Sequence, residues 1–427
     1  MVSNTIRVNT AAAFEQAIDG DATIVEIEGV IDNLSSARLR RGVHLVGVGD
    51  GAELRFRQGQ PGLMLRAGHR VANLRLVTDD TQVALGLSDE EEDLGLLDIR
   101  SVTTVGRFHL EASRAMRGDI RLHGIRVERA DARLAVRRPA GFGVEVVIGA
   151  LTVYNAAKTG DSRWTLDARD LSGGSKEQPL RGSGVFVFGG DYIPIDADMT
   201  TAPAPTARGG GIDLSYLETG DIHVDGGIPA GMGNLISGGV FVGSGVHARH
   251  VVNKGPVATY GPNDMVLDNW GKVDAWSAQA PVTSYGASGI GFVNFGDIDA
   301  LAITAPIQTH GLGARGFNLY DGTLGEAQFD SISTYGDGAI GIQLSRPFGK
   351  VSVRGDVRTK GGEGESLVRG KVVHLKAHAL SLKPGAKGDM LTIGGAAVAE
   401  DNGIEDLDFE APASVIGDLA IGGTRIA

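Results

Sequence analysis

The chain has 427 residues, a formal net charge of −12 and no cysteine. The acidic balance argues against nucleic acid as a partner, and the lack of cysteine excludes disulfides, thiolate metal sites and cysteine nucleophiles. Sixty-five glycines, in a chain with a normal apolar content of 42%, indicate a folded protein with many short turns.

The N-terminal residues predict a helical cap. Phe14, Ala17 and Ile18 share one helical face, and Thr10 is a suitable N-cap. We expect residues 1–22 to cover the open end of a repeat structure. The sequence shows no apolar signal segment and no run long enough to span a membrane. It is therefore expected to be cytoplasmic as written, or the mature form of an exported bacterial protein.

Short β-branched runs with a blurred period occupy residues 23–180, and longer coils with a Pro-rich loop occupy 181–254. The loop, residues 191–210, contains three prolines among threonine and alanine. From 255 to 395 the period is about 25 residues, and 396–427 is expected to be a C-terminal cap. The repeat is carried by Thr259-Tyr260-Gly261, Ser284-Tyr285-Gly286, Thr309-His310-Gly311 and Thr334-Tyr335-Gly336.

Each coil contains three short apolar segments separated by glycine. Alternation points Leu267, Phe292, Phe317 and Ile342 inward, with Asn269 and Asn294 at the next inward positions. Buried asparagines near a turn satisfy backbone groups at a bend. Arg315 breaks the inward pattern. This arrangement predicts one all-β solenoid, a single-stranded right-handed parallel β-helix.

The opening of the chain resembles the pectate-lyase-like superfamily. The resemblance rests on the predicted helix, then Ile27-Glu28-Gly29-Val30-Ile31, then Val43-His44-Leu45-Val46-Gly47-Val48-Gly49. It implies the β-helix fold and an extended carbohydrate as partner. That superfamily includes lyases, hydrolases and inert adhesins, and the chain lacks the Trp-Ile-Asp-His block of pectate lyases and the Gly-His-Gly of polygalacturonases.

A ladder of charged residues on the third strand of each coil is the candidate catalytic site. Outward columns should bring together His223, Arg249, Asp274 and Asp299, beside Asp221, His247, Lys272 and Asp297. Two carboxylates such as Asp274 and Asp299 or Asp297 would serve hydrolysis of a polysaccharide. Elimination would instead need a base, Lys272 or Arg249, and neutralisation of a substrate carboxylate. A solvated face of paired charges explains the same pattern.

Aromatic residues form two further columns. Tyr260, Tyr285, His310 and Tyr335 recur at one turn, and Trp270, Phe295 and Tyr320 at another position, with Trp276 flanking the charged ladder. Trp276, Trp270, Tyr260, Tyr285 and Tyr320 are the candidate sugar-binding residues, since aromatic faces pack on sugar rings. Stacking along the solenoid, or burial in a homo-oligomer such as a trimer, is the alternative.

No cofactor is expected, because no metal motif is present. Several carboxylates near the Pro-rich loop would be the ligands of a Ca²⁺ ion if one binds. They are Asp191, Asp196, Asp198, Asp213, Glu218 and Asp225. The sequence thus favours a carbohydrate-active hydrolase or lyase, with a non-catalytic adhesin or structural β-helix as the alternative.

Overall fold

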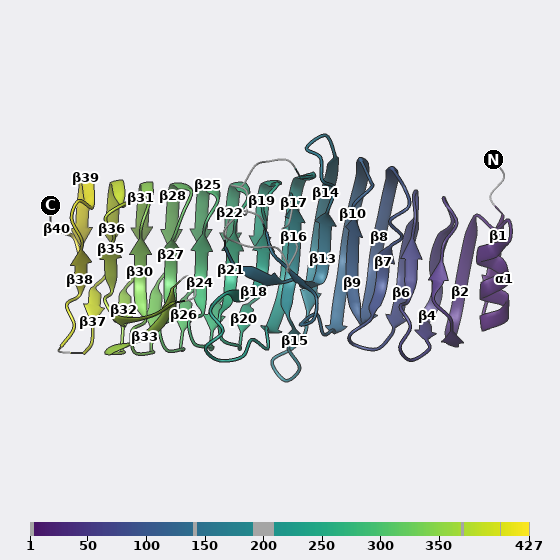
Figure 1. Cartoon of the computed structure of the whole chain (residues 1–427), viewed down its shortest axis with the longest axis horizontal. Helices are drawn as coiled ribbons and strands as arrows, with labels where there is room; N and C mark the ends of the chain where they lie inside the picture. Colours follow the sequence, from purple (N-terminus) through teal and green to yellow (C-terminus); the bar gives the residue numbers. More distant parts are fainter. Residues whose placement is uncertain (1–3, 140–142, 191–208, 369–370, 402, 427) are drawn as a thin grey trace.

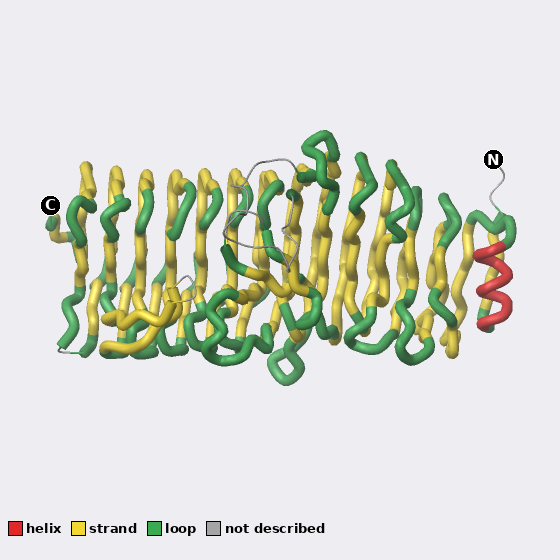
Figure 2. The backbone as a smooth tube through the Cα atoms, in the orientation of Figure 1, coloured by secondary structure: helices red, strands yellow, loops and turns green. Residues whose placement is uncertain are grey.

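The computed structural model describes residues 4–139, 143–190, 209–368, 371–401 and 403–426. Strands stacked in parallel form a long β-solenoid, with one helix at its N-terminal end (Figures 1 and 2). The Pro-rich loop expected at 191–210 lies almost wholly outside the described residues. No helix in the described ranges is long and apolar enough to cross a bilayer.

The first sheet follows the whole length of the solenoid. Its longer strands are β1 (Thr5–Val8), β2 (Ile24–Leu34), β4 (His44–Phe56), β6 (Arg70–Val77), β8 (Asp93–Val105), β10 (Arg117–Arg129), β14 (Arg163–Gly173), β17 (Gly211–Asp225), β19 (Val246–Asn253), β22 (Lys272–Ala278), β25 (Asp297–Ile303), β28 (Thr323–Phe329), β31 (Pro347–Val353), β36 (Lys387–Ile393) and β39 (Ser414–Ile421). Its short strands are β15 (Leu180–Arg181), β20 (Val257–Thr259), β23 (Val282–Ser284), β26 (Ile307–Thr309), β29 (Ile332–Thr334), β32 (Val357–Thr359), β37 (Ala397–Ala399) and β40 (Thr424–Arg425).

The second sheet closes each coil from the opposite side. It contains β3 (Ala37–Arg38), β5 (Leu63–Leu65), β7 (Val83–Leu87), β9 (Arg107–Ala112), β13 (Gly149–Asn155), β16 (Ser183–Gly189), β18 (Leu235–Val242), β21 (Asp264–Asn269), β24 (Ile290–Asn294), β27 (Arg315–Leu319), β30 (Ile340–Leu344), β35 (Leu380–Leu382) and β38 (Leu407–Phe409). The described part of the expected C-terminal cap therefore adds further strands to the stack, because β37, β38 and β39 pair with β32, β35 and β36.

Two antiparallel hairpins lie outside this stack. One joins β11 (Val136–Arg137) to β12 (Glu145–Val147), and β12 also pairs with β18. The other joins β33 (Glu363–Val368) to β34 (Lys371–Lys376) and interrupts the regular coils. Figure 2 shows this second hairpin crossing the solenoid near its C-terminal end.

Helix α1 (Ala11–Asp19) occupies the N-terminal end, as predicted. The Thr10 hydroxyl accepts a hydrogen bond from the backbone N–H of Ala13, and Phe14, Ala17 and Ile18 are buried. The helix thus covers apolar side chains that an open first coil would expose to water.

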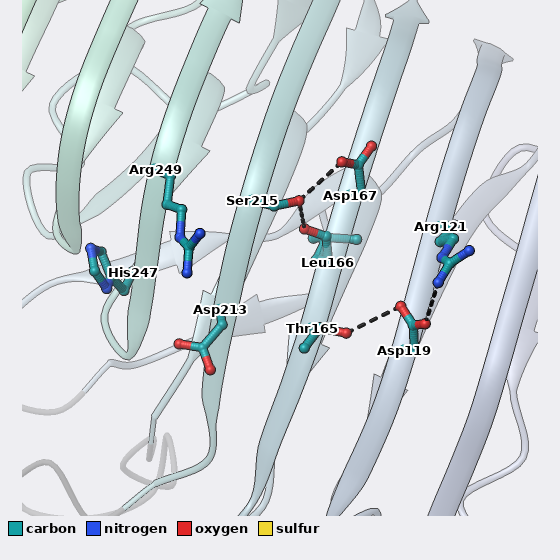
Figure 3. A pocket seen from close by; sticks show the side chains of 9 residues that line it. All are labelled: Asp119, Arg121, Thr165, Leu166, Asp167, Asp213, Ser215, His247 and Arg249. Carbon is teal, nitrogen blue, oxygen red and sulfur yellow. Dashed lines mark hydrogen bonds and ion pairs between the residues drawn. The ribbon is translucent and has the colours of Figure 1, made fainter.

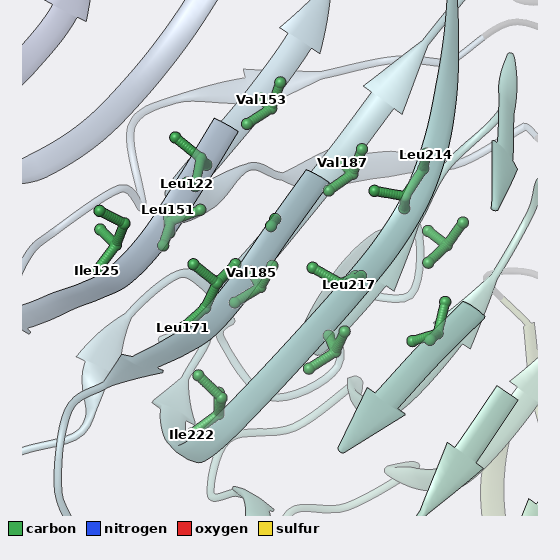
Figure 4. Close-up of a cluster of buried hydrophobic side chains, with 14 of the residues drawn as sticks. Leu122, Ile125, Leu151, Val153, Leu171, Val185, Val187, Leu214, Leu217 and Ile222 are labelled. Carbon is green, nitrogen blue, oxygen red and sulfur yellow. The ribbon is translucent and has the colours of Figure 1, made fainter. Parts of the chain in front are cut away.

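Inward side chains from the two sheets form one continuous core (Figure 4). Leu267, Phe292, Phe317 and Ile342 are in register and fully buried, which confirms their predicted orientation. In the earlier coils a left-handed residue bends β6, β8, β10 and β14 at one shared position. Asn73, Ser101, Gly124 and Asp170 hold this position in successive coils.

Candidate functional site

An open hollow of about 530 Å³ lies on the outer face of the first sheet (Figure 3). Four adjacent strands, β10, β14, β17 and β19, provide its walls. The lining residues are Asp119, Arg121, Thr165, Leu166, Asp167, Asp213, Ser215, His247 and Arg249. Apart from Leu166 these side chains are polar, so the hollow is suited to a hydroxylated or charged ligand.

Parallel pairing aligns the lining residues in columns. Asp119, Thr165, Asp213 and His247 are direct partners on successive strands. The register then shifts, because Asp167 pairs with Tyr216 and leaves Ser215 as an extra residue. Such a bulge re-aims a side chain. The Ser215 hydroxyl donates to the Leu166 carbonyl at 3.1 Å and to an Asp167 carboxylate oxygen at 3.0 Å.

Most carboxylates of the hollow already have a cation. Asp119 accepts from Arg121 at 2.8 Å and from the Thr165 hydroxyl at 3.1 Å. Asp213 accepts from Arg163 at 2.6 Å. A hydrogen bond from Arg169, with another from Ser215, lowers the pKa of Asp167. These hydrogen bonds and ion pairs therefore hold the three side chains in fixed orientations.

Arg249 differs from the other charged residues of the hollow. It forms no ion pair or hydrogen bond within the described ranges, and Figure 3 shows its side chain extending along the strand between His247 and Ser215. On the next strand, Lys272 pairs in register with His247 and is likewise without an ion pair among the described residues. Two uncompensated cations thus flank one edge of the hollow.

His247 is joined to the neighbouring strand by a short contact. Its Nε2 lies 2.7 Å from Oδ1 of Asp274, and both side chains are about two-fifths exposed. Its other ring nitrogen, Nδ1, has no hydrogen bond in the described part of the chain. A carboxylate in this position fixes the orientation of the imidazole and leaves one nitrogen available for proton transfer.

The predicted column of Arg249, Asp274 and Asp299 is present. Pairing of β19, β22 and β25 places these residues at equivalent positions, and Lys272 pairs with Asp297. Asp297 accepts from the Thr323 hydroxyl at 2.6 Å, whereas Asp299 is exposed. Of the six predicted catalytic residues, only Arg249 lines the hollow.

The prediction for His223 was wrong. The second half of β17 pairs with β20, so His223 aligns with Ala258 and not with Arg249. Its Nδ1 lies 2.9 Å from the Tyr260 hydroxyl. The error arose because β17 forms two consecutive strand segments of its coil without a break. Asp221 and His223 were therefore assigned to the segment that pairs with β19, whereas the second half of β17 pairs with β20.

The prediction for Trp276 was also wrong. Asp274 and Ala275 both face outward, and this break in alternation turns Trp276 into the core, where it is 1% exposed. Its Nε1 donates to Oδ1 of Asn253 at 2.8 Å. Strict alternation from the buried Val273 would have placed Ala275 inside and Trp276 outside.

The aromatic columns do not offer open ring faces to a sugar. His223, Tyr260, Tyr285, His310 and Tyr335 stack with adjacent ring centroids 4.6 to 6.2 Å apart and ring planes within 14° of parallel. Lys360 covers the Tyr335 end at 5.2 Å from the ring centroid. Each internal ring is thus covered on both faces.

Trp270 and Tyr320 belong to a second apolar cluster outside the second sheet. Trp270 is 4% exposed and packs against Phe241 and Phe295, and Tyr320 packs against Phe295 at 4.9 Å. Val146 and Ile148, beside the β11–β12 hairpin, join the same cluster. Trp270 was predicted as an exposed binding residue, and its burial contradicts that prediction.

The described residues include no cluster of three groups able to hold a metal ion. Asp191, Asp196 and Asp198 lie outside the described residues. The other predicted Ca²⁺ ligands contact cations: Asp213 pairs with Arg163, Glu218 with Lys254, and Asp225 with Arg181.

Sequence reasoning missed the hollow as a unit. The signal was present in the alternating triplets Asp119-Ile120-Arg121, Asp167-Ala168-Arg169 and His247-Ala248-Arg249, which place two polar groups around one core residue. No family model matches the sequence, and neither a curated protein nor a solved structure matches the chain.

Proposed function

We propose that the hollow on β10, β14, β17 and β19 binds an acidic oligosaccharide or polysaccharide and cleaves it by β-elimination. The observation that carries this proposal is the guanidinium of Arg249, which has no ion pair among the described residues, beside the hydrogen-bonded pair His247 and Asp274. A carboxylated sugar supplies the anion that Arg249 lacks, and its hydroxyl groups match the oriented Asp, Ser and Thr side chains.

The proposed chemistry assigns one role to each group. Arg249, with Lys272 at the edge, neutralises the substrate carboxylate and so stabilises the negative charge that develops when the adjacent C–H proton leaves. His247 accepts that proton on the ring nitrogen not facing Asp274. A carbon–carbon double bond forms as the carbon–oxygen bond at the next carbon breaks. The departing oxygen takes a proton from water.

Hydrolysis by carboxylates is the competing mechanism within the same class. Asp274 and Asp299 lie on adjacent strands, about 4.8 Å apart along the solenoid, which is close to the spacing of a retaining pair. Asp274 is bonded to His247, however, and neither carboxylate lines the hollow. This arrangement favours a supporting role for Asp274.

A non-catalytic structural or adhesive role is the second candidate. It is favoured by the stacked ladder from His223 to Tyr335, in which aromatic surface serves coil-to-coil packing. It predicts a folded protein that changes no glycan.

A panel of neutral and uronic-acid glycans tests these alternatives. Elimination gives new reducing ends together with the ultraviolet absorbance of an unsaturated sugar, whereas hydrolysis gives reducing ends alone. We expect Arg249→Gln and His247→Gln to lose about 10²-fold or more in turnover. His374→Gln, an exposed histidine on the distant β34, is the control. Absence of cleavage over the whole panel would contradict the enzymatic proposal.

We also infer that the solenoid is a right-handed, single-stranded β-helix of the pectate-lyase-like kind. Parallel strands joined by crossovers are right-handed in nearly all proteins. The helix before β2 and the parallel stacking of β2 on β4 support the likeness. A crystal structure would test the handedness directly.

A further inference from the structure

Arg315 is a buried cation without a counter-ion. It lies on the outer face of β27, is 3% exposed, and has no carboxylate partner among the described residues. Its Nε donates to Gln343 Oε1 at 3.1 Å, and its Nη1 donates to the Gly313 carbonyl and the Ser366 hydroxyl, each at 3.2 Å. All three acceptors are neutral, and Nη2 donates to nothing in the described chain. A buried charge is costly unless it is paired.

Asn318, on the same strand, is a second buried polar side chain that lacks partners in the described part of the chain. Phe317 and Leu319 on either side point into the core, so Asn318 faces outward, yet it is 1% exposed. Within the described ranges, neither its amide nitrogen nor its amide oxygen has a hydrogen-bond partner. Buried side-chain amides are normally satisfied, and an orphaned one marks a missing ligand or water.

The register brings these two groups together. Asn318 pairs with Gln343 on the next strand, and Gln343 is the residue that receives the Arg315 Nε hydrogen bond. The guanidinium of Arg315 therefore contacts Gln343, the direct neighbour of Asn318 on the next strand, one strand spacing of roughly 4.8 Å away. Ser366 of β33 accepts a hydrogen bond from the guanidinium of Arg315 and donates one to the Gly313 carbonyl. The β33–β34 hairpin therefore covers the guanidinium.

We propose that a small carboxylate anion binds between the guanidinium of Arg315 and the amide of Asn318, beneath the β33–β34 hairpin. The planar fork of arginine matches a carboxylate, and the Asn318 amide nitrogen adds a third donor. Burial also lowers the pKa of Arg315 to about 10. The site is on the opposite sheet from the hollow and is independent of the proposed function.

Thermal unfolding in sodium formate tests the site, with ionic strength held constant by a bulky sulfonate salt. The midpoint of the unmodified protein should rise with the logarithm of formate concentration, by roughly 1 to 2 °C for each tenfold increase above the dissociation constant. Arg315→Gln should abolish this response. Arg346→Gln, which removes an exposed arginine paired with Asp321 nearby, should retain it.

Asn318→Asp gives an independent result, because the new carboxylate supplies the missing counter-charge. This variant should unfold at a higher temperature than the unmodified protein without formate, and should no longer respond to formate. A lower midpoint for Asn318→Asp would overturn the proposal, because the carboxylate would then be buried without a cation. A response to formate that survives Arg315→Gln, or none in the unmodified protein, would also overturn it and leave water as the occupant.

Discussion

The amide nitrogen of Asn269 donates to the amide oxygen of Asn294 at 2.7 Å, and both side chains are fully buried between adjacent coils. The Asn294 amide nitrogen in turn reaches the Gly296 carbonyl at 2.7 Å and the Thr323 carbonyl at 3.2 Å. The two later coils have Leu319 and Leu344 at this position. The asparagine ladder thus satisfies backbone carbonyls at the bend of successive coils.

Asn294→Leu should therefore lower the free energy of unfolding by about 1 to 3 kcal/mol, because buried acceptors lose their donor. Chemical denaturation measures this change. Gln308→Leu is the matched control, since the Gln308 side chain has no hydrogen bond in the described ranges and its replacement should change little. Equal effects for the two variants would show that the ladder contributes nothing specific.

Asp264 should make stability fall as the pH rises. Burial raises the pKa of Asp264 to about 6, although the N–H groups of Gly226 and Gly261 and the Ser237 hydroxyl donate to it. In the unfolded chain an aspartate has a pKa near 3.9. Between pH 4 and 6 the unfolded state releases a proton that the folded state retains, so up to about 3 kcal/mol of stability is lost.

Asp264→Asn removes this contribution. The free energy of unfolding of the variant should rise relative to the unmodified protein between pH 4 and 6, and then stay constant. Asp356→Asn should show the reverse at lower pH: its free energy of unfolding should fall relative to the unmodified protein as the pH rises to about 4, because the Ala396 N–H and then Arg358 lower the pKa of Asp356 below its unfolded value. Urea denaturation at several pH values measures both differences. A pH-independent difference for Asp264→Asn would contradict the assignment.

Tyr285 should matter for stability and not for glycan binding. Its ring lies 5.3 Å from Tyr260 and 5.0 Å from His310, nearly parallel to both, although the residue is 46% exposed. Tyr285→Ser should cost about 1 to 2 kcal/mol of unfolding free energy. Leu312→Ser, at an exposed apolar residue, is the control. Weakened retention on a glycan column with unchanged stability would restore the sugar-binding interpretation.

The two candidate mechanisms make different demands on Asp274 and Asp299. If Asp274 orients His247, Asp274→Asn should lower turnover about 10²-fold or more and alter its dependence on pH, while Asp299→Asn has little effect. Comparable losses in both variants, with products that lack ultraviolet absorbance, would indicate a hydrolytic carboxylate pair. Both side chains are partly or fully exposed, so neither substitution should disturb folding.

The regular coils could be predicted because glycine, threonine and tyrosine recur at a fixed spacing. The predicted inward and outward positions were wrong where a strand departs from strict alternation of its side chains. At Asp274 and Ala275 two consecutive residues face outward, and no residue type in the sequence marks that break. His223 was misplaced because β17 passes through a bend without a gap.

The structure of the earlier coils was harder to predict from the sequence for a different reason. Their bends rest on single left-handed residues of different types, Asn73, Ser101 and Asp170, and the intervening lengths vary. The hollow lies among these coils, so its members are far apart in sequence and no repeat connects them. Arg121 and Arg169 lie two residues from the carboxylates they pair with, but the pairing of Asp213 with Arg163 and the meeting of the four strands follow from cross-strand register, which the sequence alone does not specify.

Gly261, Gly286, Gly311 and Gly336 form a column, since they occupy the same position in successive regular coils. This column limits how the chain can change in length. A side chain at Gly286, Gly311 or Gly336 would place its Cβ about 2 Å from the carbonyl of the preceding glycine in the column. Each of these positions therefore accepts only glycine. A 25-residue deletion such as 286–310 removes one copy and brings Gly261 against Gly311, which restores the same contact. Whole coils are therefore interchangeable units of insertion and deletion.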